Sequence, residues 1–284
     1  MVNKVKNSTF FAESEDILSI LKSHFGNLDE ASIKKISTGW TNIVFEVKNN
    51  SKAYIVRFPR NNFFSKQIQK DVIANNFLKN NLRIKTVNMQ IAFDNGRPFS
   101  IHEKIDGIAL TERIDCLNSE KINSITKDIA EFYLKLHNFP KDKIPNELKV
   151  NLSDFLVELS KVDDNYYDYS SLLELKDSEK NESVLVHGDL NIGNVLLDKN
   201  DDIIAFIDFA FCGLSDRYSD LARISCRVSE EFLDKIIYNY EKFSGLIINK
   251  NILDRRNKMW KYIEEQYIIY MKNSHPEIIL PEGC

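Results

Sequence analysis

The stretch from Val184 to Gly213, VLVHGDLNIGNVLLDKNDDIIAFIDFAFCG, constrains what this chain can fold into more than any other. Its apolar runs are short enough for strands, and the loops between them carry His187, Asp189, Asn194 and Asp208. Loops held by such a scaffold are where catalytic groups tend to lie. Asp208 directly follows the apolar run IIAFI, so its carboxylate is either exposed at a strand end or neutralised by a cation, because a buried unpaired charge is costly.

The polar side chains of this stretch suit phosphoryl transfer. Mg²⁺ prefers oxygen ligands, and nucleotide phosphates and waters usually complete the set that the protein begins. Asn194 and Asp208 can supply such oxygens, and Asp189 can accept the proton of an acceptor hydroxyl. These residues therefore suit phosphoryl transfer with Mg²⁺ and a nucleotide.

The residues before this stretch show the period of strands, interrupted by one helix. Turn residues at Asn49-Asn50 and Asp94-Asn95-Gly96 separate segments in which apolar side chains alternate with polar ones. We expect strands at residues 42–47, 53–58, 87–93 and 99–105, and an inserted helix at residues 65–80. The first part of the chain is therefore predicted to be a small antiparallel sheet with one helix.

The second part of the chain is mainly helical in its pattern. Apolar residues at helical spacing predict a helix that runs to Leu136, with Ser119 placed to cap its start. Further helices are expected around residues 155–159, at residues 229–240 and around Trp260.

Together these elements predict an α+β fold with two lobes. We expect a nucleotide-binding lobe at residues 1–106 and a helical lobe at residues 107–284 that holds the catalytic loop and the acceptor site. The net charge of −4 argues against a nucleic-acid partner, because proteins that bind nucleic acids usually carry a basic surface. No apolar run approaches the roughly 18 residues that a membrane span needs, and no secretion signal is evident. We therefore expect a cytoplasmic monomer that contacts no membrane.

The motif HGDLNIGNVLLD followed by IDFAFCG resembles the catalytic and metal loops of the aminoglycoside phosphotransferase and choline kinase superfamily. This resemblance implies a bilobal protein-kinase-like fold. It also implies that Asp189 is the catalytic base, that Asn194 and Asp208 are the Mg²⁺ ligands, and that His187 is a structural residue of the loop. The downstream segment GLSDRYSDLARI is similar to the family's next segment, in which Asp220 would brace the catalytic loop by hydrogen bonds.

The segment STGWTNIVFEV resembles the nucleotide loop of this superfamily, especially its G-x-T-N form. A phosphate cradle needs backbone N–H groups and small hydroxyls, which Ser37, Thr38 and Thr41 can provide. Arg57 in YIVRFPR stands where related kinases have a phosphate-binding Lys, and a guanidinium can bind phosphate bidentately. An outward-facing strand arginine is the alternative for Arg57.

The remaining nucleotide contacts are implied by spacing and resemblance. Asp71 matches the position of the helix carboxylate that partners the cation at Arg57, although an exposed helix aspartate is the alternative. Backbone groups near His102 and Lys104 would hydrogen-bond the purine. Side-chain identity there does not separate ATP from GTP.

The acceptor site in this superfamily lies mostly in the helical lobe, beside the catalytic base. Acidic residues that could line it are Asp163, Asp164, Glu230, Glu231, Asp234, Glu264 and Glu265. Each of these also fits an ordinary solvated helix face. Trp260, Tyr262 and Tyr267 either form an aromatic wall for a cation or belong to the core.

Three functional classes follow from these observations. The first expectation is a kinase that transfers the γ-phosphoryl group of ATP or GTP to a hydroxyl of a cationic acceptor, namely an aminoglycoside antibiotic. A metabolic kinase for choline or another amino alcohol is the alternative that GWTN and Arg57 favour. A nucleotide-binding regulatory pseudokinase is the third class, and the intact Asp189, Asn194 and Asp208 speak against it.

Overall fold

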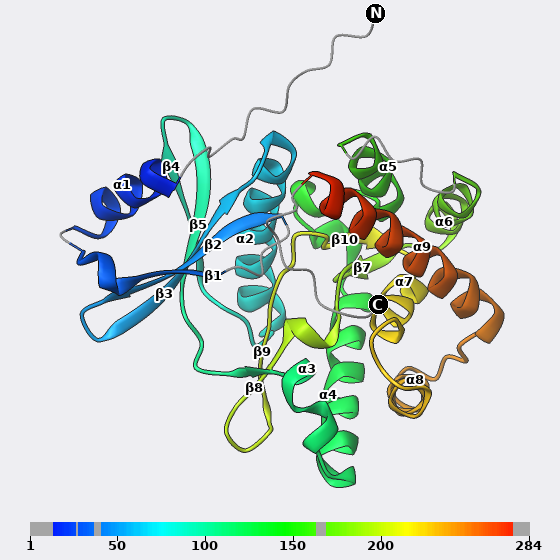
Figure 1. Ribbon diagram of the computed structural model, residues 1–284. Helices are drawn as coiled ribbons and strands as arrows, with labels where there is room; N and C mark the ends of the chain where they lie inside the picture. The colour runs from blue at the N-terminus through cyan, green and yellow to red at the C-terminus, as the bar shows by residue number, and fades with distance from the viewer. Residues whose placement is uncertain (1–13, 27, 37–40, 163–168, 275–284) are drawn as a thin grey trace, which may run out of the picture.

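The computed structural model describes residues 14–26, 28–36, 41–162 and 169–274, which form two lobes (Figure 1). The N-terminal lobe contains helix α1 (Ser14–Phe25) and a five-stranded antiparallel sheet in the order β1-β2-β3-β5-β4. Its strands are β1 (Ile33–Ile36), β2 (Asn42–Asn49), β3 (Lys52–Pro59), β4 (Met89–Asp94) and β5 (Arg97–Glu103). The larger lobe is mainly helical, so the predicted bilobal α+β fold is confirmed.

The two predicted hairpins are present, and their turns have the backbone that tight hairpins need. Asn50, between β2 and β3, has a φ of 55°, and Asn95 and Gly96, between β4 and β5, have φ values of 46° and 80°. In the β4–β5 turn both central residues have positive φ, which matches the right-handed twist of the flanking strands, and in the β2–β3 turn the first central residue has it. β4 begins at Met89, two residues later than the alternation predicted.

The two faces of the sheet have different partners because successive side chains of a strand point to opposite faces. On one face, Val56, Phe58 and Phe99 form a buried cluster with Ile17 and Leu21 of α1. The rings of Phe58 and Phe99 are stacked there, with their centroids 5.0 Å apart. The opposite face, which carries Arg57 on β3 and His102 on β5, is turned toward the larger lobe.

Helix α2 (Asn62–Leu82) is inserted between β3 and β4, and it connects the two lobes (Figure 1). Asn61 caps it, because its side chain accepts a hydrogen bond of 3.0 Å from the N–H of Phe64. The buried side chains Phe64, Ala74 and Leu78 belong to the core of the larger lobe rather than to the core under the sheet. Val72 of the same helix packs against Met89 of β4 in a separate cluster, so α2 contacts both lobes. A lobe boundary at residue 106 remains a prediction.

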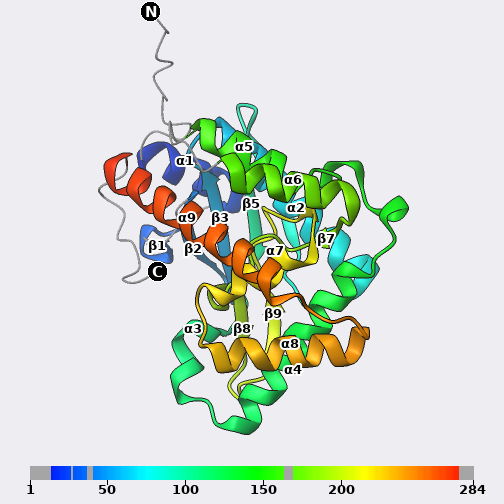
Figure 2. The same ribbon diagram turned by 90° about the vertical axis from the view of Figure 1, so that its right-hand side faces the viewer.

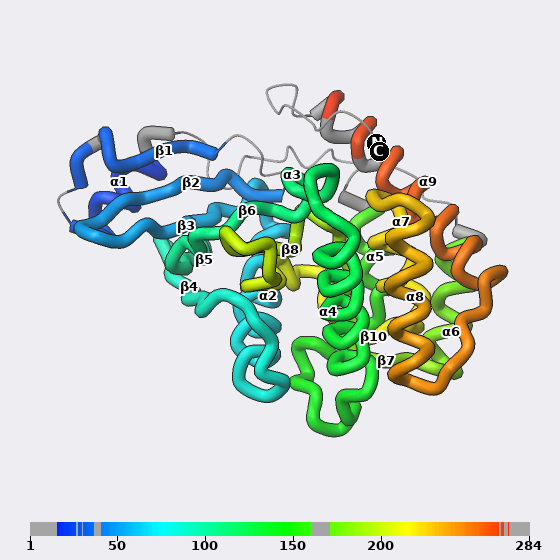
Figure 3. Tube along the Cα trace, turned by 90° about the horizontal axis from the view of Figure 1, so that it is seen from below, coloured from blue at the N-terminus to red at the C-terminus, as the bar shows by residue number. Residues whose placement is uncertain are grey.

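The larger lobe begins after a short linker and is built from helices around three short strand pairs. Its helices and strands are β6 (Ile108–Ala109), α3 (Leu110–Arg113), α4 (Ser119–His137), α5 (Leu152–Val162), α6 (Tyr169–Asn181), β7 (Val184–Val186), β8 (Val195–Leu197), β9 (Ile203–Phe206), β10 (Gly213–Ser215), α7 (Arg217–Ser225), α8 (Glu230–Ser244) and α9 (Lys250–Ser274). Helix α9 crosses α7 (Figure 2), and α4 lies along α8 (Figure 3). Strand β7 pairs with β10, and β8 pairs with both β6 and β9.

The start of α4 differs from the prediction that Ser119 caps it. Asn118 is the capping residue, and its side chain accepts a hydrogen bond of 2.9 Å from the N–H of Lys121. Ser119 is already the first residue of the helix, so its own side chain does not take the capping position. Both residues are favourable caps, which is why the sequence alone placed the boundary one residue too late.

Trp260 belongs to the core of the larger lobe. Its side chain is 2% exposed, and its indole N–H donates a hydrogen bond of 3.1 Å to the carbonyl oxygen of Ser219. This placement favours the core interpretation of Trp260 over an aromatic wall for an acceptor. The side chain of Tyr267 lies outside the described residues. Among the described helices, none is both long and apolar enough to cross a bilayer.

The anchoring of α2 predicts a large loss of stability when its buried face is truncated. Leu78→Ala removes a fully buried side chain from the main core, so we expect a loss of about 2–5 kcal/mol in the free energy of unfolding. The exposed neighbour Lys79 provides the matched control, and Lys79→Ala should change it by less than about 0.5 kcal/mol. Denaturant unfolding measures both, and equal small effects would contradict the assignment of α2 to the core.

Candidate active site

The catalytic loop predicted from the sequence lies between β7 and β8, and it ends in a short 3-10 helix at Ile192–Asn194. β9 then leads directly to Asp208. The two predicted loops touch, because the N–H of Ile207 donates a hydrogen bond of 3.0 Å to the carbonyl oxygen of Asn194. Residues that are distant in the sequence are thus brought together at one end of these short strands.

Asp220 on α7 braces the catalytic loop, as the sequence predicted. Its fully buried carboxylate accepts hydrogen bonds from the N–H groups of His187 at 3.0 Å and Gly188 at 2.9 Å. The ring of His137 on α4 lies 3.1 Å from the same carboxylate. The backbone of the loop is therefore held by a side chain from a separate helix.

His187 is a structural residue of the loop. Its Nδ1 accepts a hydrogen bond of 3.2 Å from the N–H of Asp189, so its Nε2 carries the proton and donates to the carbonyl oxygen of Ile207 at 3.2 Å. Burial lowers the pKa of His187, while the neighbouring carboxylates act in the opposite direction. A neutral imidazole with this tautomer satisfies both backbone groups.

Asn194 and Asp208 present oxygen atoms suited to a hard cation. The side-chain amide nitrogen of Asn194 donates a hydrogen bond of 3.0 Å to the carbonyl oxygen of Asp189, which leaves the amide oxygen for another partner. The side chain of Asp208 is 38% exposed, and its backbone has a φ of 66°. A non-glycine residue in this region costs about 1 kcal/mol or more, and such residues cluster at functional sites.

This donor set fits Mg²⁺ bound together with a nucleotide. Mg²⁺ binds oxygen ligands and usually takes only a few from the protein. Within the described part of the chain, no group of three or more His, Cys, Asp or Glu side chains could hold a metal ion by itself. Phosphate oxygens would therefore have to complete a coordination sphere that Asn194 and Asp208 begin.

Arg57, Asp71 and Asp208 meet where the two lobes join. The guanidinium of Arg57 donates a hydrogen bond of 2.9 Å to Asp71, and its Nη1 lies 4.0 Å from the carboxylate of Asp208. Asp71 also accepts hydrogen bonds from the N–H of Phe209 at 2.8 Å and from the side chain of Asn75 at 2.7 Å. Burial raises the pKa of Asp71, and the charge of Arg57 acts in the opposite direction. The ion pair expected from spacing is thus present.

The predicted phosphate loop is described only at its end. Ser37 and Thr38 lie outside the described residues. Thr41 precedes β2, where its carbonyl oxygen accepts a hydrogen bond of 3.1 Å from the N–H of Arg60. Its hydroxyl oxygen accepts one of 2.8 Å from the side chain of Asn42. Thr41 therefore lies at the N-terminal end of strand β2, next to the start of the β3–α2 connection.

The predicted purine contacts, His102 and Lys104, lie at the end of β5. Burial lowers the pKa of His102 to about 4, with a further contribution from the charge of Arg57, so the ring is neutral at neutral pH. The backbone N–H of Lys104 donates a hydrogen bond of 2.8 Å to the carbonyl oxygen of Ala53. Its ammonium group pairs with Glu46 at 2.7 Å. The N–H of Lys104 thus already has a partner in the sheet, and the purine contacts near His102 and Lys104 stay a prediction.

The carboxylate of Asp189 contacts a residue that the sequence analysis did not single out. The Nε of Arg223 on α7 donates a hydrogen bond of 2.6 Å to it. Burial raises the pKa of Asp189, and the charge of Arg223 acts in the opposite direction. The signal in the sequence was the position of Arg223, three residues after Asp220 on a helix that already reaches the catalytic loop.

The acidic residues proposed to line an acceptor site differ in their surroundings. Glu264 is buried and forms ion pairs with Arg223 and Arg227. Glu231 is exposed at the start of α8 and pairs with Lys235. Asp163 and Asp164 lie outside the described residues. Glu264 therefore already has two cationic partners, which weakens its case as a ligand of an ammonium group.

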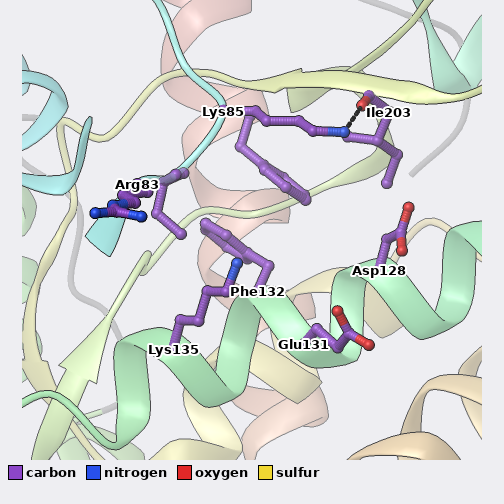
Figure 4. A pocket seen from close by; sticks show the side chains of 9 residues that line it. Arg83, Lys85, Asp128, Glu131, Phe132, Lys135 and Ile203 are labelled. Atoms are coloured by element: carbon purple, nitrogen blue, oxygen red, sulfur yellow. Dashed lines mark hydrogen bonds between the residues drawn. The ribbon is translucent and has the colours of Figure 1, made fainter. Parts of the chain in front are cut away.

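A separate hollow lies where residues 83–85 cross α4 and β9 (Figure 4). Arg83 and Lys135 are on one side of it and Asp128 is on the other. Lys85 and Ile203 both line it, and the Nζ of Lys85 donates a hydrogen bond of 2.8 Å to the carbonyl oxygen of Ile203. None of the residues predicted for the active site lines this hollow. We therefore place the candidate site at the lobe junction.

Comparison with known proteins identifies the family. The model of the phosphotransferase enzyme family (APH) matches residues 32–250, which is more than half of the chain. The chain therefore belongs to the phosphotransferase enzyme family. The resemblance stated from the catalytic motifs and the prediction of a phosphotransferase are both confirmed. Among the curated proteins, none matches this sequence.

Solved structures share the fold over almost the whole chain at low sequence identity. The APH(2")-IIia structure, a complex with GDP and kanamycin, has a TM-score of 0.69 and 17% identity, and the match covers 93% of this chain and 94% of that chain. An aminoglycoside-3'-phosphotransferase of type VIII has a TM-score of 0.68 and 15% identity, and the match covers 89% of this chain and 98% of that chain. A macrolide 2'-phosphotransferase of type I has a TM-score of 0.66 and 16% identity, and the match covers 93% of this chain and 94% of that chain. At these identities the likeness shows the fold.

The tight loop between β7 and β8 predicts that replacing Gly188 destabilises the protein. Its φ is 80°, and a Cβ atom there would lie 2.5 Å from the carbonyl oxygen of Phe211. Gly96 has the same φ with nothing within 4 Å, so Gly96→Ala measures the backbone cost alone, which should be about 1 kcal/mol. Gly188→Ala should cost about 1–3 kcal/mol more because the neighbouring backbone must move.

Denaturant unfolding of the two alanine variants measures this difference. Equal losses in the free energy of unfolding would show that the backbone around Gly188 yields easily, which contradicts the close contact with Phe211.

Proposed function

We propose that this phosphotransferase transfers the γ-phosphoryl group of ATP or GTP to a hydroxyl group of a small cationic acceptor, with an aminoglycoside as the first candidate. The observation that carries the proposal is the convergence of Asp189, Asn194 and Asp208 on two touching loops. Arg57 faces the same place from the sheet, 4.0 Å from Asp208. This is the set of groups that phosphoryl transfer needs.

In this proposal each side chain has a distinct role. Asp189 orients the acceptor hydroxyl and accepts its proton, and Arg57 binds the nucleotide phosphates while Asp71 fixes its direction. Asn194 and Asp208 would hold Mg²⁺, which would neutralise the charge that develops on the phosphates. Backbone groups after β5 and the loop at residues 37–41 would contact the rest of the nucleotide.

Aminoglycosides are the first candidates because of the relatives with the same fold. One of the structures compared above is described as an aminoglycoside-3'-phosphotransferase, and another is described as a complex of APH(2")-IIia with GDP and kanamycin. A third is described as a macrolide 2'-phosphotransferase, so macrolides belong among the acceptors to be tested.

An amino alcohol such as choline is the second candidate, and one observation favours it. Glu264 is a buried acid that is linked to the proposed base through Arg223, and it already pairs with two arginines. An aminoglycoside gains affinity from several carboxylates at once, so the loss of this one weakens the argument for a polycation. A single ammonium group depends less on an acidic lining.

A panel of acceptors tests the proposal. Purified protein is assayed for ATP and GTP consumption with kanamycin, gentamicin, a macrolide, choline and ethanolamine. Asp189→Asn should lower kcat by at least about 10²-fold on the acceptor that reacts, while nucleotide affinity stays nearly unchanged. Turnover of choline alone would reject the antibiotic-kinase assignment, and a variant with wild-type turnover would reject Asp189 as the base.

The metal assignment has its own test. Asp208→Ala should abolish the dependence of nucleotide binding on Mg²⁺, because the remaining amide oxygen of Asn194 carries no full charge. Asp202→Ala is the matched control, since Asp202 is an exposed carboxylate that pairs with Lys121 outside the site. Calorimetric titration of nucleotide with and without Mg²⁺ measures both variants. An unchanged metal dependence in Asp208→Ala would exclude Asp208 as a ligand.

A further inference from the structure

We propose that Arg223 is a positioning residue, which holds the carboxylate of Asp189 in the orientation from which it receives the acceptor hydroxyl. The proposal rests on the function proposed above, in which Asp189 is the base. It assigns a second residue to the reaction, one that lies on α7 and outside the loops that carry the recognised motifs.

The backbone and the side chain of Asp189 are held by different groups. Its N–H donates to the ring of His187 at 3.2 Å, and its carbonyl oxygen accepts from Asn194 at 3.0 Å. These contacts fix the backbone but leave the carboxylate able to rotate. Within the described part of the chain, Arg223 is the hydrogen-bond partner of that carboxylate, at 2.6 Å from Oδ1.

This contact leaves one edge of the carboxylate for a substrate. Arg223 occupies Oδ1, so Oδ2 is the oxygen that can accept a hydrogen bond from an acceptor hydroxyl. A base must lie within hydrogen-bond reach of its proton, and a displacement of about 1 Å can lower a rate by about 10²-fold. Restricting the rotation of Asp189 therefore acts directly on the step that it performs.

Arg223 can restrict Asp189 because it is itself restricted. Its side chain is nearly buried, and its Nη1 donates a hydrogen bond of 3.2 Å to Glu264 on α9. Its guanidinium carbon lies 5.4 Å from the ring centroid of Trp260, which is fixed in turn by its bond to Ser219. Glu264 is also paired with Arg227. A connected set of side chains from α7 and α9 thus ends on the catalytic carboxylate.

The chemistry of arginine suits this role better than that of lysine. Nε and Nη1 of one planar group point to two different carboxylates, Asp189 and Glu264, at the same time. A lysine ammonium is a compact point charge on a flexible stem and does not reproduce such a fork. Burying the charges of Arg223 and Asp189 costs solvation free energy, so their ion pair contributes little net stability to the fold. Stabilisation alone therefore does not explain why the pair is there.

A double-mutant cycle in kcat tests the proposal, using Arg223→Met, Asp189→Asn and the double variant. The reaction is transfer to whichever acceptor of the panel reacts, or basal nucleotide hydrolysis, in which water replaces the acceptor. Arg223→Met alone should lower kcat by at least about tenfold, with nucleotide affinity and acceptor KM changed by less than about threefold. In the Asp189→Asn background the same substitution should change kcat by less than about twofold, because the carboxylate that Arg223 positions is absent.

Two further variants separate positioning from support of the fold. Arg223→Lys should recover only part of the lost turnover, since it keeps the charge but not the fork. Arg227→Met is the matched control, because Arg227 shares Glu264 but its described ion pair does not involve Asp189. Arg227→Met should change kcat by the same factor in the wild-type and the Asp189→Asn backgrounds. Denaturant unfolding establishes that each variant is folded, and if Arg223→Met is not, the cycle is run with Arg223→Lys.

The outcomes distinguish the two proposals. If Asp189→Asn leaves kcat unchanged, the function proposed for Asp189 fails. If Asp189→Asn lowers kcat but the Arg223 substitution lowers it by the same factor in both backgrounds, or not at all, only the positioning role of Arg223 is overturned. A cycle that is non-additive for Arg223 and additive for Arg227 supports the role.

Discussion

The arrangement of the two lobes depends on the hydrogen bonds and the ion pair that the buried carboxylate of Asp71 makes. It pairs with Arg57 from the sheet, accepts a hydrogen bond from Asn75 on its own helix and accepts another from the N–H of Phe209 in the larger lobe. A buried carboxylate is costly without such partners. The sheet, α2 and the loop after Asp208 therefore have to come together for the charge to be satisfied, and the side of the candidate site that carries Arg57 is the result.

The packing of α2 supports the same junction. Its buried side chains Phe64, Ala74 and Leu78 lie in the main core, and the ring of Phe63 stacks on Phe155 of α5 with centroids 5.7 Å apart. Residues 83–85 then continue across β9, where the N–H of Phe206 bonds to the carbonyl oxygen of Lys85 at 2.8 Å. The sheet thus meets the larger lobe through α2. Because α2 packs on the larger lobe, Asp71, the partner of Arg57, is held in place.

The sequence predicted the parts of this protein that are encoded locally. The hairpins follow from alternation and from turn residues such as Asn95 and Gly96, and the catalytic loops follow from a motif whose residues lie close together in the chain. The pairing of Arg223 with Asp189 and Glu264 could not be predicted in this way, because it joins residues from three elements far apart in the sequence. Local propensity also did not decide between Asn118 and Ser119 as the cap, since both suit the position.

The left-handed backbone of Asp208 has a consequence for which amino acids this protein can use there. A φ of 66° is tolerated readily by glycine and, among side-chain-bearing residues, mainly by asparagine and aspartate. Of those residue types, aspartate alone brings a negative charge to the place that Arg57 faces. The conformation of the loop and the negative charge that faces Arg57 are thus two independent constraints, and aspartate is the residue type that satisfies both.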